Sequence, residues 1–270
     1  MLNSTQLNYS WIDNKKEFSF LESTIFLHNI FLVITSTEID AFDFFVYLLT
    51  QKNRKMSTLK LATNALHAGH DVTTNGGTRA VPIYQTTSYV FNNSEHAANL
   101  FSLKELGFIY TRLNNPTNQI LQDRLAAVEG GIGAVVFASG TAAIATGLLT
   151  LLKAGDHIVA SSSLYGGTYN LLSVTLPRLG ITTTFVDASN PDNFDAAVQE
   201  NTRAFFAESL GNPKLDVLDL EAISTHSKKA EVPFIVDNTV ATPVLLNPIK
   251  HGADIVIHSL TKYIGGQGTS

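Results

Sequence analysis

The sequence predicts an α/β fold with a mostly parallel sheet and helices on both of its faces. Beyond residue 156, short apolar or β-branched runs alternate with segments of helical periodicity, which is the order of elements in such sheets. Polar or charged residues stand where several apolar runs stop, and parallel sheets bind ligands beyond the carboxyl ends of their strands. The same two observations therefore predict a fold class and the edge that carries the site.

Size and composition agree with a single large domain. The chain has 270 residues, of which 44% are hydrophobic and 15% charged, so it can bury a sizeable core. The net charge of -5 and the lack of a basic stripe argue against nucleic acid as a partner. There are no cysteines, which excludes disulfides and thiolate metal ligands and fits a reducing cytoplasm.

Residues 1–55 differ in character from the rest. The apolar run Ile25 to Ile34 is interrupted by His28 and Asn29, so it is too short and broken for a transmembrane helix. A basic start and a small-residue cleavage site are lacking, which argues against a signal peptide. We interpret 1–55 as a non-catalytic extension and Met56 as the original start. The alternative is a genuine extra element.

The next segment, 56–115, is expected to form an N-terminal arm. Residues 67–93 have loop character because glycine and asparagine interrupt them. The run Ile109 to Thr117 then contains Tyr110 and Arg112, whose phenol and guanidinium can together hold a phosphate. A surface arginine beside a packing tyrosine is the alternative interpretation.

An anion site is predicted after this arm. Asn118 to Glu129 has helical spacing and ends at two glycines, and Ala134 to Ala138 is expected to be a buried strand. Ser139, Gly140 and Thr141 follow, and an apolar helix comes next. Backbone N–H groups and the helix dipole would converge on an anion there. A tight turn without a ligand is equally compatible, whereas a dinucleotide fingerprint fails because its glycines precede the strand.

Four further strands and three helices complete the alternating pattern. The strands are expected at His157 to Ala160, Thr183 to Val186, Ala204 to Glu208 and Phe234 to Val236, and the helices at Thr168 to Leu179, Phe194 to Gln199 and Leu220 to Lys229. Two polar side chains lie on the turns between these elements. Tyr165 follows a strand and precedes two glycines, although an aromatic residue in a turn is more often packing. Asn212 precedes a proline, where plain turn chemistry is the alternative.

The last stretch carries the strongest chemical signal. The run VPFIVDN ends a buried strand with Asp237, and a buried carboxylate is costly unless a cation meets it. The run ADIVIHSLTK delivers Lys262 to the end of another strand, between hydroxyl residues Ser259 and Thr261 that could hold a phosphate. A Schiff-base lysine with a protonated pyridine nitrogen on Asp237 accounts for both strands. The alternative is an ordinary solvated lysine.

Several runs resemble the pyridoxal-phosphate (PLP) enzymes of cysteine and methionine metabolism. The runs that carry this resemblance are VDNT and HSLTK. Within the family, the greatest similarity is to the branch of O-acetylhomoserine sulfhydrylases, and it is carried by RAVPIYQTTSYVF, SSSLYGGTYNLL, GNPKLDVLDLEA and DNTVATP. The resemblance extends from about Thr63 to Ser270. It implies the large domain of an aspartate-aminotransferase-like, fold type I transferase, here over residues 116–270, and a small C-terminal domain that is absent.

The resemblance also implies roles for individual residues. Lys262 and Tyr165 would be catalytic, the tyrosine by stacking on the cofactor ring and assisting proton transfer. Asn212 would bond the 3-oxygen of PLP. Tyr110 and Arg112 would reach the cofactor phosphate of a neighbouring subunit, which implies a homodimer or homotetramer. The remaining cofactor contacts would come from Asp237, Ser139, Gly140, Thr141, Ser259 and Thr261.

The activity implied by the resemblance belongs to cytoplasmic methionine biosynthesis. It is the replacement of the acetate of O-acetyl-L-homoserine by sulfide, giving L-homocysteine. Cystathionine γ-synthase or a methionine or cystathionine γ-lyase is the alternative with the same cofactor. The chain ends at Ser270, before the family's small domain and its substrate-carboxylate arginine. A non-enzymatic truncated product is therefore a third hypothesis, and an incomplete gene model is one explanation of the end.

Overall fold

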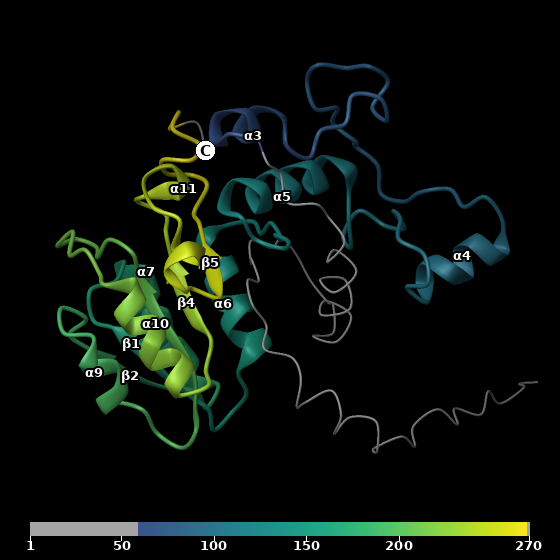
Figure 1. Cartoon of the computed structure of the whole chain (residues 1–270). Helices are drawn as coiled ribbons and strands as arrows, with labels where there is room; N and C mark the ends of the chain where they lie inside the picture. Colours follow the sequence, from purple (N-terminus) through teal and green to yellow (C-terminus); the bar gives the residue numbers. More distant parts are fainter. Residues whose placement is uncertain (1–58, 269–270) are drawn as a thin grey trace, which may run out of the picture.

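A computed structural model of the chain describes residues 59–268 (Figure 1). Five strands form one parallel sheet in the order β2-β1-β3-β4-β5. They are β1 (His157–Ser161), β2 (Thr182–Val186), β3 (Thr202–Glu208), β4 (Phe234–Asp237) and β5 (Ile255–Ile257). The predicted α/β class and its parallel sheet are confirmed. The expected start at Met56 lies outside the described residues.

Helices precede and connect these strands. The longer helices are α3 (Leu61–His67), α4 (Ser94–Phe101), α5 (Pro116–Glu129), α6 (Gly140–Leu151) and α10 (Leu220–Lys229). The shorter ones are α7 (Gly166–Asn170), the π-helix η2 (Leu171–Thr175), α8 (Leu176–Arg178), α9 (Asp192–Ala196), α11 (Thr242–Leu245) and the 3-10 helix η3 (Pro248–His251). The segment that carries α4 projects away from the sheet (Figure 1).

The core divides into two layers, one on each face of the sheet. Side chains of a strand alternate between its faces, so neighbouring strand residues enter different layers. Phe206 of β3 packs with Leu148 of α6 and Leu172 of η2. Phe205, on the other face, packs with Phe194 of α9 and Ile223 of α10. Helices therefore cover both faces, as predicted.

The boundaries of α5 follow from local chemistry. Asn115 caps the helix by accepting a hydrogen bond from the Thr117 N–H, and Pro116 stands at the first helical position. Gly130 ends the helix with φ 78°, a left-handed conformation that glycine adopts without strain. The predicted stop at this glycine is confirmed, and the helix starts two residues before the expected Asn118.

The predicted strand at Ala134 to Ala138 is wrong. These residues form no ladder with a neighbouring strand, and the chain bends at Ala138. Ala134 and Val136 are buried in the core layer that contains α5, which explains the apolar pattern. The Val136 N–H donates instead to the side-chain oxygen of Gln122 on α5, so a side chain takes the place of a partner strand.

Two predicted helices differ in detail. The helix expected at Thr168 to Leu179 is a continuous run from α7 to α8, and it widens to a π-turn just before Pro177. Proline lacks an N–H and its ring clashes with the carbonyl four residues earlier, which disfavours a regular α-helical turn there. The helix expected at Phe194 to Gln199 ends at Ala196, because the Gln199 N–H donates to the Thr202 hydroxyl outside the helix.

Candidate active site

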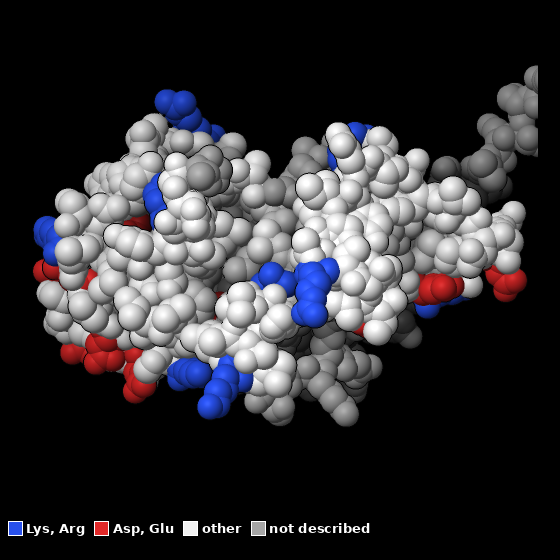
Figure 2. Space-filling view, turned by 90° about the horizontal axis from the view of Figure 1, so that it is seen from above, with Lys and Arg blue, Asp and Glu red and all other residues white. Residues whose placement is uncertain are grey.

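The candidate site lies where β1, β3, β4 and β5 end. The strand order reverses between β1 and β3, because the connection from β1 to β2 runs over one face and the connection from β3 to β4 over the other. Ligands of such sheets bind at this reversal. Figure 2 views the molecule from the side of α3 and α11, and the Lys and Arg side chains form a few separate groups there.

Two carboxylates stand side by side at this edge. Glu208 ends β3, Asp237 ends β4, and the two residues are partners in the strand register. Burial raises the pKa of Glu208 to about 7, the charge of Asp237 adds to the increase, and a hydrogen bond from the Tyr165 N–H opposes it. Burial also raises the pKa of Asp237, against hydrogen bonds from Thr239 and the charge of His258. Both carboxylates would be stabilised by a cation.

The start of α6 packs against the residue that follows His258. A Cβ placed on Gly140 would lie 2.8 Å from the Ser259 Cβ and 3.1 Å from its Cα. Only glycine fits there, and it brings the helix start to the end of β5. Ser139 caps α6 by accepting from the Ala142 N–H at 3.1 Å, and the N–H groups of Gly140 and Thr141 belong to the first turn, which has no intrahelical partner.

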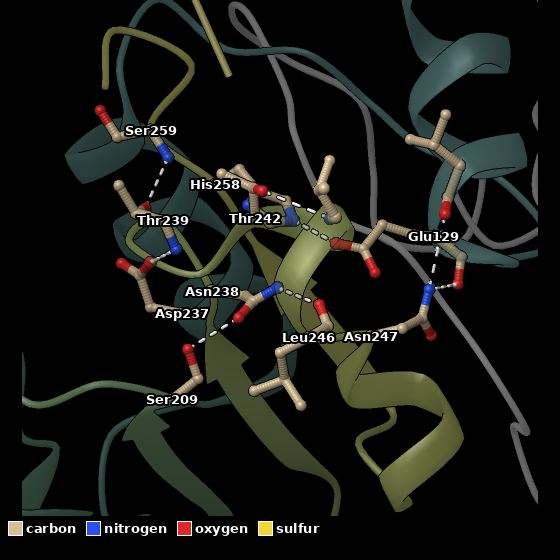
Figure 3. A network of polar contacts seen from close by, with 12 residues as sticks. Glu129, Ser209, Asp237, Asn238, Thr239, Thr242, Leu246, Asn247, His258 and Ser259 are labelled. Atoms are coloured by element: carbon tan, nitrogen blue, oxygen red, sulfur yellow. Dashed lines mark hydrogen bonds and ion pairs between the residues drawn. The ribbon is translucent and has the colours of Figure 1, made fainter. Parts of the chain in front are cut away.

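Hydrogen bonds join the ends of β3, β4 and β5 (Figure 3). The Ser209 N–H donates to the Asp237 carbonyl at 2.9 Å, and the Ser209 hydroxyl donates to the Asn238 side chain at 2.7 Å. The Thr239 N–H donates to the Asp237 carboxylate at 3.0 Å, and the Thr239 hydroxyl accepts from the Ser259 N–H at 2.8 Å. The carboxylate and the start of the lysine-bearing turn are thus held together.

Lys262 and Thr261 lie on the turn that follows β5, and both are exposed. The turn is closed by the Lys262 N–H, which donates to the Ser259 carbonyl at 3.1 Å. A second bond runs from the Gly266 N–H to the Lys262 carbonyl at 2.8 Å. The lysine follows β5, as the sequence predicts, and Ser259 packs against Gly140 at the start of α6. That these residues hold a cofactor stays a prediction.

Tyr165 and Asn212 lie on the turns that flank the reversal of strand order. The Tyr165 N–H donates to Glu208 at 2.6 Å, while the residue as a whole is 53% exposed and accessible to a ligand. Asn212 is exposed on the turn after β3. That turn is held to the end of β1 by a 2.9 Å hydrogen bond from the Ser163 hydroxyl to Asp216.

Tyr110 and Arg112 lie apart from this group, on the segment that leads into α5. The Arg112 guanidinium stacks 4.2 Å from the centre of the Tyr110 ring, and Arg112 is exposed. Tyr110 is also bridged to Ser88. The two residues thus form a local pair, and within residues 59–268 neither makes a hydrogen bond or an ion pair to the sheet edge.

Several site residues were not found from the sequence. Glu208 closes a predicted strand, so the argument that found Asp237 would have found it as well. The role of Thr239 could be predicted only by knowing that this residue faces the end of β5. The same holds for Glu129 and His258, which contact each other across 129 positions of the chain.

The arrangement fits pyridoxal phosphate. A protonated ring nitrogen would supply the cation that the raised pKa of Asp237 calls for. The first turn of α6, with the hydroxyl of Ser259 against Gly140, would suit a phosphate. A lysine follows the neighbouring strand. Together, the parallel sheet and this edge define the large domain of a PLP-dependent enzyme of fold type I.

Residues 62–270 match the family described as "Cys/Met metabolism PLP-dependent enzyme", and the chain belongs to this family. An O-acetyl-L-homoserine sulfhydrylase of Leptospira meyeri is 58% identical over 78% of this chain and 48% of its own length. An L-methionine gamma-lyase of Fusobacterium nucleatum subsp. polymorphum is 48% identical over 77% of this chain and 53% of its own length.

A solved structure from Campylobacter jejuni supports the fold. It is assigned as an O-acetylhomoserine (thiol)-lyase and holds N′-pyridoxyl-lysine-5′-monophosphate. Its TM-score is 0.76 at 45% identity, over 79% of this chain and 52% of its own length. The chain thus spans about half the length of the relatives it matches. Within residues 59–268, the helices are too short or too polar to cross a membrane.

Proposed function

We propose that the chain supplies the cofactor-binding part of an enzyme that converts O-acetyl-L-homoserine and sulfide into L-homocysteine and acetate. Hydrosulfide forms a bond to the γ-carbon, the bond from that carbon to the acetyl oxygen breaks, and acetate leaves with the electron pair. The observation that carries the proposal is the meeting of Asp237, Ser259 and Gly140 at one sheet edge, one turn before Lys262. The 58% identity to a sulfhydrylase supports the choice of substrate.

The cofactor, when bound, withdraws electrons from the substrate's α-carbon. Asp237 is assigned to the protonated ring nitrogen, because burial raises the pKa of its carboxyl group and a further cation would stabilise the ionised form. Ser139, Gly140, Thr141, Ser259 and Thr261 would hold the phosphate through hydroxyls and N–H groups, and Asn212 would bond the 3-oxygen.

Lys262 is proposed to hold the cofactor and to move protons: its amine would bond the aldehyde carbon while the aldehyde oxygen leaves as water. Its amine would accept the proton of the substrate's α-carbon and return it. Tyr165, which is exposed beside Glu208, would stack on the cofactor ring and assist this transfer. These two residues are the proposed catalytic pair.

Tyr110 and Arg112 are proposed to complete the phosphate site of a second copy of the chain. They lie away from the sheet edge of their own chain, and the exposed guanidinium supplies a cation suited to a phosphate. A homodimer or homotetramer would follow from this arrangement. We place residues 56–115 in the arm, residues 116–270 in the large domain, and the enzyme in the cytoplasm, which the absence of cysteine supports.

An absorbance spectrum tests the cofactor site. The purified chain with PLP is expected to show a visible band that Lys262→Ala lacks and that Lys250→Ala, an exposed lysine of η3, retains. Borohydride reduction followed by peptide mass spectrometry should place the label on Lys262. A label on another lysine, or a band that survives Lys262→Ala, would overturn the assignment.

Product analysis separates the two enzymatic candidates. Homocysteine formed from O-acetylhomoserine and sulfide supports the sulfhydrylase. Cleavage of methionine would instead support the γ-lyase, which the 48% identity to a methionine gamma-lyase favours as second candidate. A chain that shows the band without either product would bind the cofactor without completing the reaction.

A further inference from the structure

Two ionisable side chains meet behind the candidate site, fully removed from water. His258 directly follows β5, and Glu129 is the last residue of α5. The Nε2 atom of His258 contacts the Oε1 atom of Glu129, and both side chains are 0% exposed. Burying a carboxylate and an imidazole costs free energy that only close pairing offsets. An apolar pair would fill this position more simply, which calls for an explanation of the charges.

The pair lies at a junction of three segments (Figure 3). The side chain of Asn247, just before η3, donates to the Glu129 carbonyl at 2.6 Å. The Glu129 carboxylate keeps its second oxygen, Oε2, without a hydrogen-bond partner among the described residues. The carboxylate is therefore aimed at the imidazole, which is the group that can carry a balancing positive charge.

The imidazole also acts on Asp237. The Asn238 N–H donates to the Ile257 carbonyl at 2.8 Å, which places the residue after Asp237 beside the residue before His258. The charge of His258 favours the ionised form of Asp237, against the effect of burial. His258 therefore stands between Glu129 and Asp237, the carboxylates on α5 and β4.

The lysine-bearing turn starts at the same imidazole. Ser259, the next residue, is fixed by its hydrogen bond to Thr239 and by its contact with Gly140. Its carbonyl accepts the hydrogen bond that closes the turn at Lys262. Anchoring the His258 ring in the core thus fixes the first residue of the turn.

We propose that Glu129 and His258 are positioning residues of the cofactor site. Glu129 holds the His258 imidazole as a cation, and this cation keeps Asp237 ionised and ready for a protonated ring nitrogen. The role of the pair in cofactor binding rests on the proposed function. The effect of the His258 charge on Asp237 concerns the protein without cofactor. The charged groups that act on the imidazole in the described part of the chain are Glu129 on α5, which contacts it, and Asp237 on β4, whose ionised form its charge favours.

The test uses a double variant that retains the hydrogen-bonding capacity and removes both charges. In Glu129→Gln/His258→Gln, two amides replace the ion pair, so that no uncompensated charge stays buried. The carboxyl signals of ¹³C-labelled aspartate are followed against pH without cofactor, and Asp237→Asn assigns the signal. The Asp237 titration midpoint is expected to rise by about one pH unit or more in the double variant, since a neighbouring opposite charge shifts a carboxyl by about one to three units.

A second arm measures PLP affinity. The double variant is expected to bind PLP about tenfold more weakly, which corresponds to a change of one unit in the pKa of Asp237. Asp237 titrating as in the wild type in a folded double variant would overturn the proposal. Should PLP fail to bind the wild type while the midpoint moves as expected, the proposed function fails and the electrostatic inference stands.

The wild-type chain provides a measurement that needs no folded variant. The ¹⁵N signals of the His258 ring report its protonation. They are assigned as the signals lost in His258→Gln or, if that variant does not fold, by their contacts to Glu129. At pH 7 we expect both ring nitrogens of His258 to carry a hydrogen atom. A neutral ring would sink the proposal whatever the variants do.

Discussion

At the scale of single residues, the function of this edge depends on where charge is buried. Glu208 and Asp237 both end strands, and neighbouring parallel strands end at the same place. Two partly or fully buried carboxylates therefore face one ligand position. One of them would meet the cation of the cofactor, and Glu208 would hold the turn that carries Tyr165.

The buried Glu208 makes stability depend on pH. Its pKa is raised from 4.5 to about 7, so the folded chain keeps a proton that the unfolded chain loses between these values. Stability is therefore expected to fall as the pH rises through this window, and to be unaffected by this group below it. Glu208→Gln should gain up to about 3 kcal/mol relative to the wild type between pH 4 and pH 8.

Urea denaturation at several pH values checks this expectation, with the exposed Glu200→Gln as a control that should follow the wild type. A Glu208→Gln variant whose stability parallels that of the wild type at every pH would contradict it.

Gly140 is expected to tolerate no side chain. The Cβ of Gly140→Ala would lie 2.8 Å from the Ser259 Cβ, so the end of β5 must move or the helix start must shift. Overpacking of this kind costs about 1–3 kcal/mol, of which the better helix propensity of alanine recovers up to about 1 kcal/mol. We expect lower stability in denaturant and weaker PLP retention.

Gly166→Ala is the matched control, because it changes the first residue of α7 and its Cβ meets no atom within 4 Å. Equal stability of the two variants would show that the contact with Ser259 is not tight.

Single residues were predictable from the sequence where one strand end decides their place. Asp237, Ser259 and Lys262 follow apolar runs, and the rule for parallel sheets brings them to one edge. The contact between Glu129 and His258 was not predictable from the sequence. The pattern of Asn118 to Glu129 gives no sign that its last carboxylate turns inward toward a residue 129 positions away.

At the scale of elements, apolar periodicity identified the layers and the capping residues set the ends. Leu220 to Lys229 matches α10 in both boundaries, because Asp219 caps it by accepting from the Ala222 N–H. The run at Ala134 to Ala138 shows the limit of this argument. Burial alone produces the same alternation as a strand, and the sequence does not tell whether a partner strand is available.

The joint between the arm and α5 gives an element-scale prediction. Asn115 caps α5 and also donates to the Tyr84 carbonyl at 2.9 Å and to the Thr111 hydroxyl at 3.2 Å. Asn115→Ala removes the cap and leaves a partly buried carbonyl unpaired, so we expect a loss of about 2–4 kcal/mol. Limited proteolysis should cut the segment 75–112 faster.

Asn93→Ala removes a cap of the same kind, since the Asn93 side chain accepts from the His96 N–H at the start of α4. That residue is exposed and makes no other bond of this type in the described segment, so a loss of about 1 kcal/mol is expected. Should both variants lose the same amount, the ties from Asn115 to the arm contribute nothing to stability.

At the scale of the whole molecule, the arm is the part that the sheet does not explain. Its segment around α4 projects from the large domain (Figure 1), and Ile83 and Val90 of the arm are 84% and 95% exposed. A partner that covers this part of the arm would remove both apolar side chains from water. The partner proposed above is a second copy of the chain, whose phosphate site Tyr110 and Arg112 would complete.

Self-association is therefore expected to depend on these two side chains. Burying a valine or isoleucine contributes about 1.5–3 kcal/mol, and a buried aspartate costs more, so Ile83→Asp/Val90→Asp should weaken association by about a hundredfold or more. Sedimentation velocity measures this directly. Leu179→Asp, an exposed position just before β2 at the opposite end of the strands, serves as the control and should associate like the wild type.

If the double variant assembles as before, another surface must join the subunits, and Tyr110 and Arg112 lose their assigned place in a shared site. If it becomes monomeric and also loses its affinity for PLP, the phosphate site is completed by the second copy, as proposed.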